Sequence, residues 1–378
     1  MQLGRLRLWR PFRVIRFRYL AALATLALIG PPVGIAARCA LAPVEPIEAG
    51  PQDPPAVRRA KEHISSYQRS GASTYLTMPG WFIVFATDEY AAALAADRPS
   101  RFPYFNAVGQ YWISYHAMCR PACGSYPFDA GDHLMLAVAG VGYTIDNTVK
   151  GVYENTIGRA TEALATTDTD EDRFAAATAT AYGRFMHMTP WYDFSFRRRL
   201  SLLWSQVPML GPHPLRKWER RLALTVEYSL KTIYGWAIRR VVKAFSSDED
   251  EWIYAWADRV PDATLRDPRL RRVTAFGRGS YILALRRHEL FTGVVPQLAA
   301  AGVHFNDIAG SRRILITAVC DREHTPSDDP DAHLLFIKRL LTSTAQQRVG
   351  IDTNVEKLGE ALKRLADAGA VLEHIYDF

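Results

Sequence analysis

An acid, a lysine and a tyrosine occur twice in this chain with the same spacing. In each set the lysine lies four residues after the acid, and the tyrosine lies three residues after the lysine, so a helix would carry all three on one face. The first set is Asp146, Lys150 and Tyr153, and the second is Glu227, Lys231 and Tyr234. Side chains of these types can hold the polar part of a ligand through ion pairs and hydrogen bonds.

Two interpretations of these sets are open. If the helices are exposed, each acid and lysine form a solvated pair that contributes only about 0.3–0.5 kcal/mol. If the helices face each other across a twofold-like axis, both sets line one interior, where charges are costly and usually mark a ligand or ion site. The apolar run LMLAVAGVGYTI before the first set is too short to span a bilayer but could be buried or dip into lipid. The second interpretation, a ligand site lined by both sets, is our site hypothesis.

A second group of residues has the atoms that bind zinc. The segment HAMCRPACGSYPFDAGDH contains His116, Cys119, Cys123 and His133, and both imidazole and thiolate are zinc ligands. Their spacing matches no recognised zinc finger or catalytic zinc pattern. Cys119 and Cys123 could equally form a small disulfide or stay free. A metal-dependent enzyme that uses this segment is the alternative function.

Familiar catalytic motifs are absent from the sequence. The chain contains no Walker loop, no GxGxxG after a strand, no GxSxG elbow and no HExxH. A nucleotide-dependent or redox enzyme of a familiar type is therefore not expected, and the sequence specifies no cofactor. It does not decide whether the protein is an enzyme of another kind.

The segments that carry the two sets resemble each other beyond those residues. Residues 144–159 (TIDNTVKGVYENTIGR) and 225–240 (TVEYSLKTIYGWAIRR) align at an offset of 81, with ten identical or conservative pairs in sixteen positions. Weaker matches upstream have offsets of 91 or 92, which places extra residues in the first copy between Trp112 and Thr144. The upstream pairs are Tyr90 with Tyr182, Pro99 with Pro190, and Trp112 with Trp204. We predict an internally duplicated helical core over 76–245, with chance similarity of two amphipathic helices as the alternative.

The N-terminus has the pattern of a membrane anchor. Residues 1–18 carry six arginines and no acid, and residues 19–37 carry no charge, long enough as a helix to cross a bilayer. This charge asymmetry predicts a cytoplasmic N-terminus and a periplasmic body at a bacterial inner membrane. A cleaved signal peptide is the alternative, although Pro43 follows the candidate cleavage site. Residues 38–75 are rich in proline and are expected to form a stalk and linker.

The C-terminal part changes character. After a linker over 246–271, residues 272–378 show the order strand, helix, two strands, helix, strand, which predicts a ferredoxin-like α+β domain. The last helix and the strand in AGAVLEHIYDF resemble ACT-type regulatory modules. That resemblance implies an effector site in the loop after the first strand, but RRHEL lacks the small residues expected there.

Composition limits the choice of function. The chain of 378 residues is 48% hydrophobic and 22% charged, which indicates a folded protein, and its net charge of +7 is concentrated in the N-terminal tail. Nucleic-acid binding is therefore not expected. The fold prediction is mainly α with a C-terminal α+β domain. The function prediction is a non-enzymatic, membrane-anchored protein that binds a lipophilic ligand or a membrane protein partner, in contact with membrane lipid. A structural assembly factor, including one that forms a homo-oligomer, is a further alternative.

Overall fold

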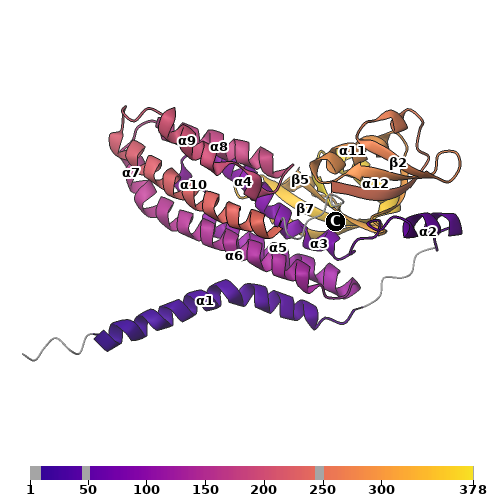
Figure 1. Cartoon of the computed structure of the whole chain (residues 1–378), viewed down its shortest axis with the longest axis horizontal. Helices are drawn as coiled ribbons and strands as arrows, with labels where there is room; N and C mark the ends of the chain where they lie inside the picture. The colour runs from indigo at the N-terminus through magenta and orange to yellow at the C-terminus, as the bar shows by residue number, and fades with distance from the viewer. Residues whose placement is uncertain (1–9, 45–51, 243–250, 378) are drawn as a thin grey trace, which may run out of the picture.

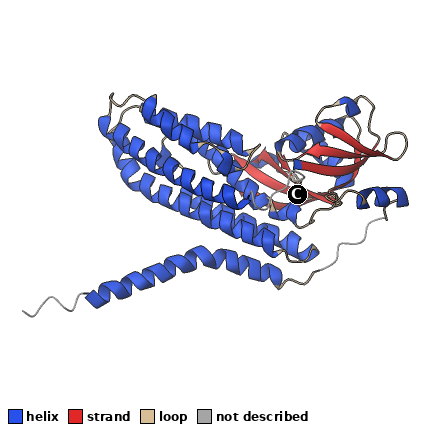
Figure 2. Ribbon diagram, in the orientation of Figure 1, coloured by secondary structure: helices blue, strands red, loops and turns tan. Residues whose placement is uncertain are grey.

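A computed structural model describes residues 10–44, 52–242 and 251–377, with the side chains of 10–24, 241 and 242 left undescribed. The chain forms a helical body followed by a C-terminal α+β region, as the composition and patterns predicted (Figures 1 and 2). The longer helices of the body are α1 (Arg10–Ala40), α4 (Met78–Ala96), α5 (Tyr104–Ser125), α6 (Ala130–Tyr153), α8 (Asp170–Met186), α9 (Phe196–Ser205) and α10 (Pro214–Val242). Shorter helices are α2 (Pro55–Glu62), α3 (Ser73–Leu76) and α7 (Arg159–Ala163).

Helix α1 contains the segment predicted to be a membrane anchor. Of the predicted basic tail, residues 1–9 lie outside the described part. Among the described residues, no helix has both the length and the apolar character needed to cross a membrane. The end of α1 packs against α5 and α6, where Ile35 and Cys39 are buried in a core cluster. The C-terminal end of the predicted anchor, at Ile35, therefore packs in the core of the helical body.

The segment predicted to be a stalk also differs from expectation. Its described residues beyond α1 form α2 and α3 and pack against the C-terminal region. Tyr67 is buried and donates a hydrogen bond to Asp307 at 2.5 Å, and Tyr75 donates one to Asp352 at 3.1 Å. Buried tyrosines with buried carboxylate partners fix this segment in place, because an unpaired carboxylate there would be costly.

The two halves of the helical body contain matching elements. Helix α4 corresponds to α8, α5 to α9, and α6 with its continuation to α10. Helix α5 runs on to Ser125, whereas α9 ends at Ser205, so the extra residues of the first half are found after Trp112, as the offsets predicted. The first half also has a π-helical turn, η2 (Glu154–Gly158), where α10 is continuous.

Residues that align between the halves make the same contacts. The indole of Trp112 donates to the hydroxyl of Thr144 at 2.9 Å, and that of Trp204 donates to Thr225 at 3.0 Å. Three aromatic rings pack together in each half, with centroids 4.9–6.0 Å apart. They are Tyr90, Phe102 and Tyr104 in the first half, and Tyr182, Phe194 and Phe196 in the second.

The C-terminal region contains two antiparallel sheets instead of the single predicted domain sheet (Figure 2). Sheet A has the strand order β2-β3-β1-β4, and sheet B has the order β6-β7-β5-β8. The strands are β1 (Trp252–Asp258), β2 (Leu270–Ala275), β3 (Tyr281–Arg286), β4 (His304–Ile308), β5 (Arg313–Asp321), β6 (Ala332–Arg339), β7 (Gln346–Asn354) and β8 (Val371–Ile375). Helix α11 (Glu289–Ala300) precedes β4, and α12 (Leu358–Asp367) precedes β8. Strand β1 lies inside the predicted linker, so the α+β region begins earlier than residue 272.

The two sheets are built by the same chain path. Each unit runs through three strands, one helix and a last strand, and its first strand pairs with its third and its fourth. Two residues after the end of each helix lies a glycine with positive φ, Gly302 or Gly369. The next residue, Val303 or Ala370, donates a backbone hydrogen bond back to the helix, to Leu298 or Leu365. A ferredoxin-like unit would have a helix between its first two strands. Here those connections, which are described throughout, carry 3-10 turns, η5 (Thr264–Arg266) and η6 (Arg322–His324).

The two sheets have different surroundings. Strand β1 alternates between buried and partly exposed residues, as in a sheet covered on one face. Strand β7 is buried at seven successive positions because sheet B is covered on both faces. One face packs with α11 and α12, and the other packs on the helical body through Leu315, Phe336 and Tyr376. Sheet B therefore joins the two parts of the molecule.

Candidate functional site

The two predicted acid–lysine pairs meet between α6 and α10. Lys150 lies 2.7 Å from Glu227 on the other helix and 3.5 Å from Asp146 on its own. Lys231 lies 2.9 Å from Glu227 on its own helix and 3.8 Å from Asp146 across the gap. We call these four residues the ion quartet. It has the twofold-like arrangement that the second sequence interpretation required.

Aromatic rings enclose the quartet on both sides. The ammonium of Lys150 lies 5.2 Å from the ring centre of Tyr90, and that of Lys231 lies 5.3 Å from the ring centre of Tyr182. Burial lowers the pKa of Lys150, but Asp146 and Glu227 outweigh it and hold that pKa well above its usual value. Burial raises the pKa of Glu227, but the two lysines outweigh it and hold that pKa far below its usual value. Lys150 and Glu227 are therefore held as a charged pair.

The two tyrosines of the predicted sets lie outside the quartet. Tyr153 donates a hydrogen bond to Glu219 in the first part of α10. Tyr234 stacks on Trp191 with ring centres 5.2 Å apart and is partly exposed. The structure therefore brings together four of the six predicted site residues. The two acids and the two lysines of the quartet pair with one another. The quartet therefore holds two helices together and does not have the geometry of an open ligand site.

The basic start of α10 is buried in a larger ion network. Arg216, Lys217, Arg220 and Arg221 are each 1–2% exposed, although their sequence suggests a solvated cationic face. Glu171, which is fully buried, lies 2.9 Å from Lys217 and 2.6 Å from Arg221. The remaining partners of these bases are Glu154, Glu162, Asp170, Asp172 and Glu219.

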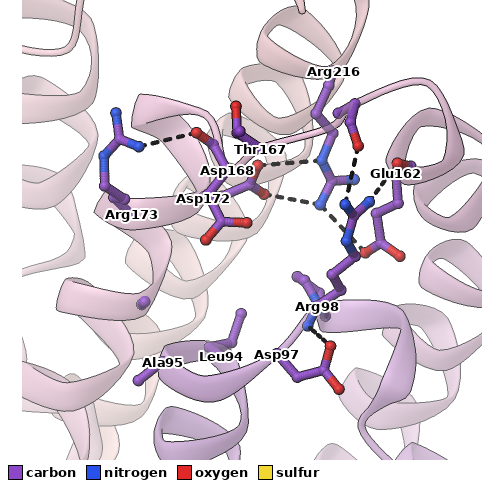
Figure 3. Close-up of a pocket in the computed structure, with 13 residues that line it drawn as sticks. Leu94, Ala95, Asp97, Arg98, Glu162, Thr167, Asp168, Asp172, Arg173 and Arg216 are labelled. Carbon is purple, nitrogen blue, oxygen red and sulfur yellow. Dashed lines mark hydrogen bonds and ion pairs between the residues drawn. The ribbon is translucent and has the colours of Figure 1, made fainter.

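A small polar pocket opens beside this network. Its volume is about 160 Å³, and Arg216 reaches it between Asp172 and Glu162, at 2.8 and 3.3 Å (Figure 3). Burial raises the pKa of Asp172, but Arg216 and Arg220 outweigh it and hold that pKa below its usual value. Arg216, Glu162 and Asp172, the least exposed charged residues that line the pocket, are already paired with one another, so none of these three groups demands a ligand.

The outward faces of α6 and α10 are apolar. Over 131–158 and over 214–239, every exposed residue is uncharged. Exposed large apolar residues on α6 and its continuation are Leu134, Met135, Val138, Ile145, Val149, Val152 and Ile157. Those on α10 are Leu215, Trp218, Leu222, Val226, Leu230, Ile233, Tyr234 and Trp236. The usual pattern of a soluble bundle is largely reversed here, because most charged side chains point inward and the large apolar side chains point outward. Asp146 and Arg239, whose side chains are 42% and 40% exposed, are exceptions.

Helix α1 extends the same apolar flank. Its C-terminal end packs beside α6, and α6 is joined to α10 by the quartet (Figure 1). Over 25–37 all exposed residues of α1 are uncharged, including Leu26, Ile29 and Val33. We call the exposed residues of 25–37, 131–158 and 214–239 the apolar flank. Exposed apolar residues in this number on three neighbouring helices indicate an interaction site in a folded protein.

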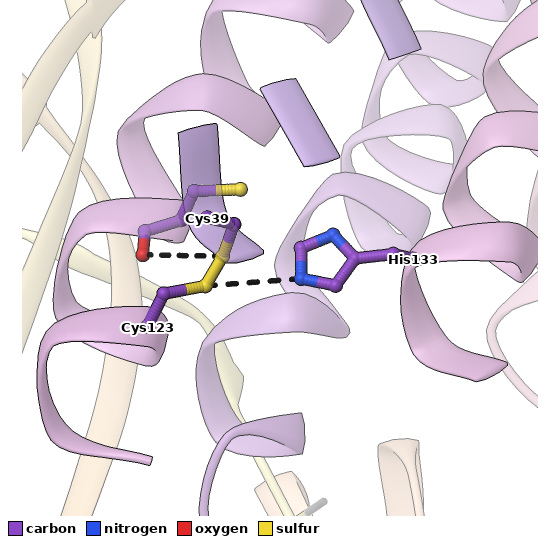
Figure 4. A group of neighbouring side chains, drawn as sticks. Cys39, Cys123 and His133 are labelled. Atoms are coloured by element: carbon purple, nitrogen blue, oxygen red, sulfur yellow. Dashed lines mark hydrogen bonds between the residues drawn. A yellow bond between two sulfur atoms is a disulfide. The ribbon is translucent and has the colours of Figure 1, made fainter. Parts of the chain in front are cut away.

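A separate cluster of sulfur and nitrogen atoms lies where α1, α5 and α6 meet. The side chains of Cys39, Cys119, Cys123 and His133 are buried, and their ligand atoms all lie within 4.8 Å of one another (Figure 4). The structure joins Cys39 and Cys123 as a disulfide, and Cys119 is a free thiol whose pKa burial raises to about 12. Of the four predicted metal ligands, His116 lies elsewhere and contacts Arg38 at 3.0 Å. Its place in the cluster is taken by Cys39.

A histidine links the helical body to the C-terminal region. The ring of His187 lies 2.6 Å from Asp88 on α4 and 3.2 Å from Glu289 at the start of α11. Hydrogen bonds to Asp88 and to Glu289 raise the pKa of His187 to about 10, although burial opposes them. The imidazole is therefore a cation at neutral pH and forms an ion bridge between the two parts.

We expect the stabilising effect of His187 to depend on pH. Its folded pKa of about 10 lies above its ordinary value of 6.5. The stability that it contributes is therefore complete below about pH 6.5 and is lost as the pH rises towards about 10. The measurement is the free energy of unfolding of wild type minus that of His187→Gln. The difference cancels the opposing contribution of Lys338, whose pKa is lowered by burial to about 7. A difference that stays constant over this range, or that equals the one for His304→Gln, would contradict the bridge.

Sequence reasoning missed two features of these sites. Cys39 is separated from Cys119 by 80 residues, so no spacing pattern connected it with the other ligands. The apolar residues Leu215, Trp218 and Leu222 alternate with the basic residues of α10 at helical spacing, a pattern that predicts the apolar side chains inward, so no sequence signal indicated that the basic residues point inward.

Comparisons with known proteins do not identify this chain, since no family model, curated protein or solved structure matches it. The resemblance of its last residues to ACT-type modules therefore stays a prediction.

Proposed function

We propose that this protein is a non-enzymatic, membrane-associated protein that docks on lipid through its apolar flank. The single observation that carries the proposal is the reversed polarity of α6 and α10. Their charged residues pair inside the helical body, while their exposed residues over 131–158 and 214–239 are uncharged. Exposed apolar area of this extent is unfavourable in water and becomes stabilising when it is transferred to lipid.

Three further features favour lipid as the occupant. The flank is continuous with α1, which carries the charge-free segment 19–37, and the arginines of the preceding tail suit the surface of anionic lipid. Trp218 and Trp236 lie exposed on α10, and indole rings favour the boundary between headgroups and acyl chains. Helices of 24 and 29 residues present the flank over about 36–44 Å, enough for contact along the membrane surface.

In this proposal the two helical units are related copies, and the ion quartet has a positioning role. Pairing of Lys150 with Glu227 fixes α6 beside α10, and Lys150, Lys231 and Glu227 are kept largely away from solvent. The quartet is then part of the scaffold for lipid contact. The N-terminal segment would hold the protein at an inner membrane, and the C-terminal region would serve assembly or regulation.

Binding of purified full-length protein to vesicles tests the proposal. We expect the wild type to float with vesicles that contain phosphatidylglycerol. Leu230→Asp should weaken this binding about tenfold, because it replaces a leucine whose transfer to lipid contributes on the order of 1.5–3 kcal/mol. The matched control is Val371→Asp, which introduces the same charge at an exposed apolar position of β8.

Several outcomes would count against lipid docking. Wild-type protein that stays in solution with vesicles of every charge would exclude it, as would equal binding by Leu230→Asp and the wild type. If gentle solubilisation instead recovers a stoichiometric partner protein whose capture requires Leu230, the flank is a protein interface and the membrane proposal fails.

A further inference from the structure

The cluster of three cysteines and one histidine has the composition of a metal site. Cys39 comes from the last turn of α1, Cys119 and Cys123 from successive turns of α5, and His133 from the first turn of α6. All four side chains are buried, at 3–8% exposure. Three helices thus bring four donor atoms close together. Cys39 on α1 and Cys119 on α5 are 80 residues apart in the chain.

The distance between Cys123 and His133 suits ligands of a small tetrahedral ion. Zinc bonds of about 2.3 Å to sulfur and 2.0 Å to nitrogen place tetrahedral ligands about 3.5–3.8 Å apart. Sγ of Cys123 lies 3.8 Å from Nε2 of His133, and all the ligand atoms lie within 4.8 Å of one another. Thiolate and imidazole donors together select zinc over magnesium or calcium, which prefer oxygen.

The histidine is held by a partner of the kind that zinc ligands have. The hydroxyl of Tyr115, which is fully buried, lies 2.6 Å from Nδ1 of His133. This contact leaves Nε2 directed towards the sulfur atoms, as Figure 4 shows. Hydrogen bonding at the second ring nitrogen fixes the tautomer and the ring orientation of a metal-bound histidine.

We propose that Cys39, Cys119, Cys123 and His133, with their thiols reduced, form a structural zinc site that fastens the end of α1 to α5 and α6. Four protein ligands in a buried position leave no open coordination position, which is the arrangement of structural and not catalytic zinc. A disulfide between Cys39 and Cys123 alone would use two of the four donors. The zinc site uses all four, and it stands independently of the proposed lipid docking.

The test is the metal content of the full-length protein, purified in detergent with a phosphine reductant and dialysed against micromolar zinc. We expect one zinc per chain by mass spectrometry of the metal. Cobalt in its place should give the intense thiolate charge-transfer absorption of a tetrahedral site. Cys39→Ser and His133→Ala should each lower zinc content at least tenfold at the same free zinc concentration.

Matched controls separate this site from incidental binding. Cys320→Ser removes the other buried free thiol, and His116→Ala removes a histidine of α5 that lies outside the cluster, so both should keep one zinc per chain. Reduced wild type without zinc or a cobalt spectrum would overturn the proposal. So would metal that survives Cys39→Ser, or a Cys39–Cys123 disulfide that persists under reductant and leaves no metal bound. The cobalt spectrum is read on the wild type, so the test does not depend on whether the variants fold.

Discussion

Glu171→Gln should lower the free energy of unfolding by about 3–5 kcal/mol, the largest effect that we expect from one substitution. Glu171 is fully buried and pairs with Lys217 and Arg221, which are each 1% exposed. Glutamine has the same size and shape, so the packing is kept and only the charge is removed. The two cations would then be left in the interior without their shared counter-charge.

Chemical denaturation followed by circular dichroism measures this effect. The control is Glu360→Gln on the exposed surface of α12, where the pair with Lys357 is solvated and the change should be below about 1 kcal/mol. A loss of less than about 1 kcal/mol for Glu171→Gln would mean that the inward-facing charges of α10 are hydrated, and the reversed polarity of the bundle would lose its basis.

Gly140→Ala should destabilise the protein by about 2–3 kcal/mol, although alanine normally favours a helix over glycine by about 1 kcal/mol. A Cβ at this position would lie 2.8 Å from the ring of Trp112 and closer still to the ring of Tyr111. Tyr111 is fully buried, and its hydroxyl donates to the carbonyl of Leu136 at 2.6 Å. The ring cannot move aside without breaking that bond, so α6 would have to shift away from α5.

Gly142→Ala provides a matched control two residues further along the same helix. Its Cβ would meet only the hydroxyl of Tyr234, at an ordinary contact distance of 3.6 Å. This variant should therefore gain about 0.5–1 kcal/mol from helix propensity. Thermal or chemical denaturation of both variants is the measurement. If both alanines raise the stability, the close approach of α5 and α6 at Gly140 is not present in solution.

The sequence predicted the positions of helices and strands better than it predicted which of them pair or pack together. The apolar stretches that became β5, β7 and α12 lie where they were expected, because burial on one or two faces leaves a local pattern. Strand β6, which follows a polar loop, is additional to the predicted order, and β1 lies in the predicted linker. The equivalence of the two sheet units rests on hydrogen-bond register, which side-chain types scarcely encode.

The site residues show the same limit. Helical spacing predicted that Asp146 and Lys150 share a face, and the aligned copy predicted a facing pair, so the quartet could be anticipated. Cys39 could not, because its proximity to Cys119 depends on how α1 packs on the body. The direction of Arg220 could not either, since a buried arginine is specified by carboxylates on other helices and not by its own neighbours.

Quenching of tryptophan emission by brominated lipid tests the central claim, lipid contact by the apolar flank, most directly. Bromine on the acyl chains quenches only the indoles that enter the membrane. In a Trp9→Phe background, which removes the indole of the N-terminal segment, we predict quenching that largely disappears in Trp218→Phe/Trp236→Phe and that persists in Trp256→Phe, where the ring removed is in β1 of sheet A. Emission that brominated lipid leaves unchanged, or quenching that survives the loss of Trp218 and Trp236, would contradict the account.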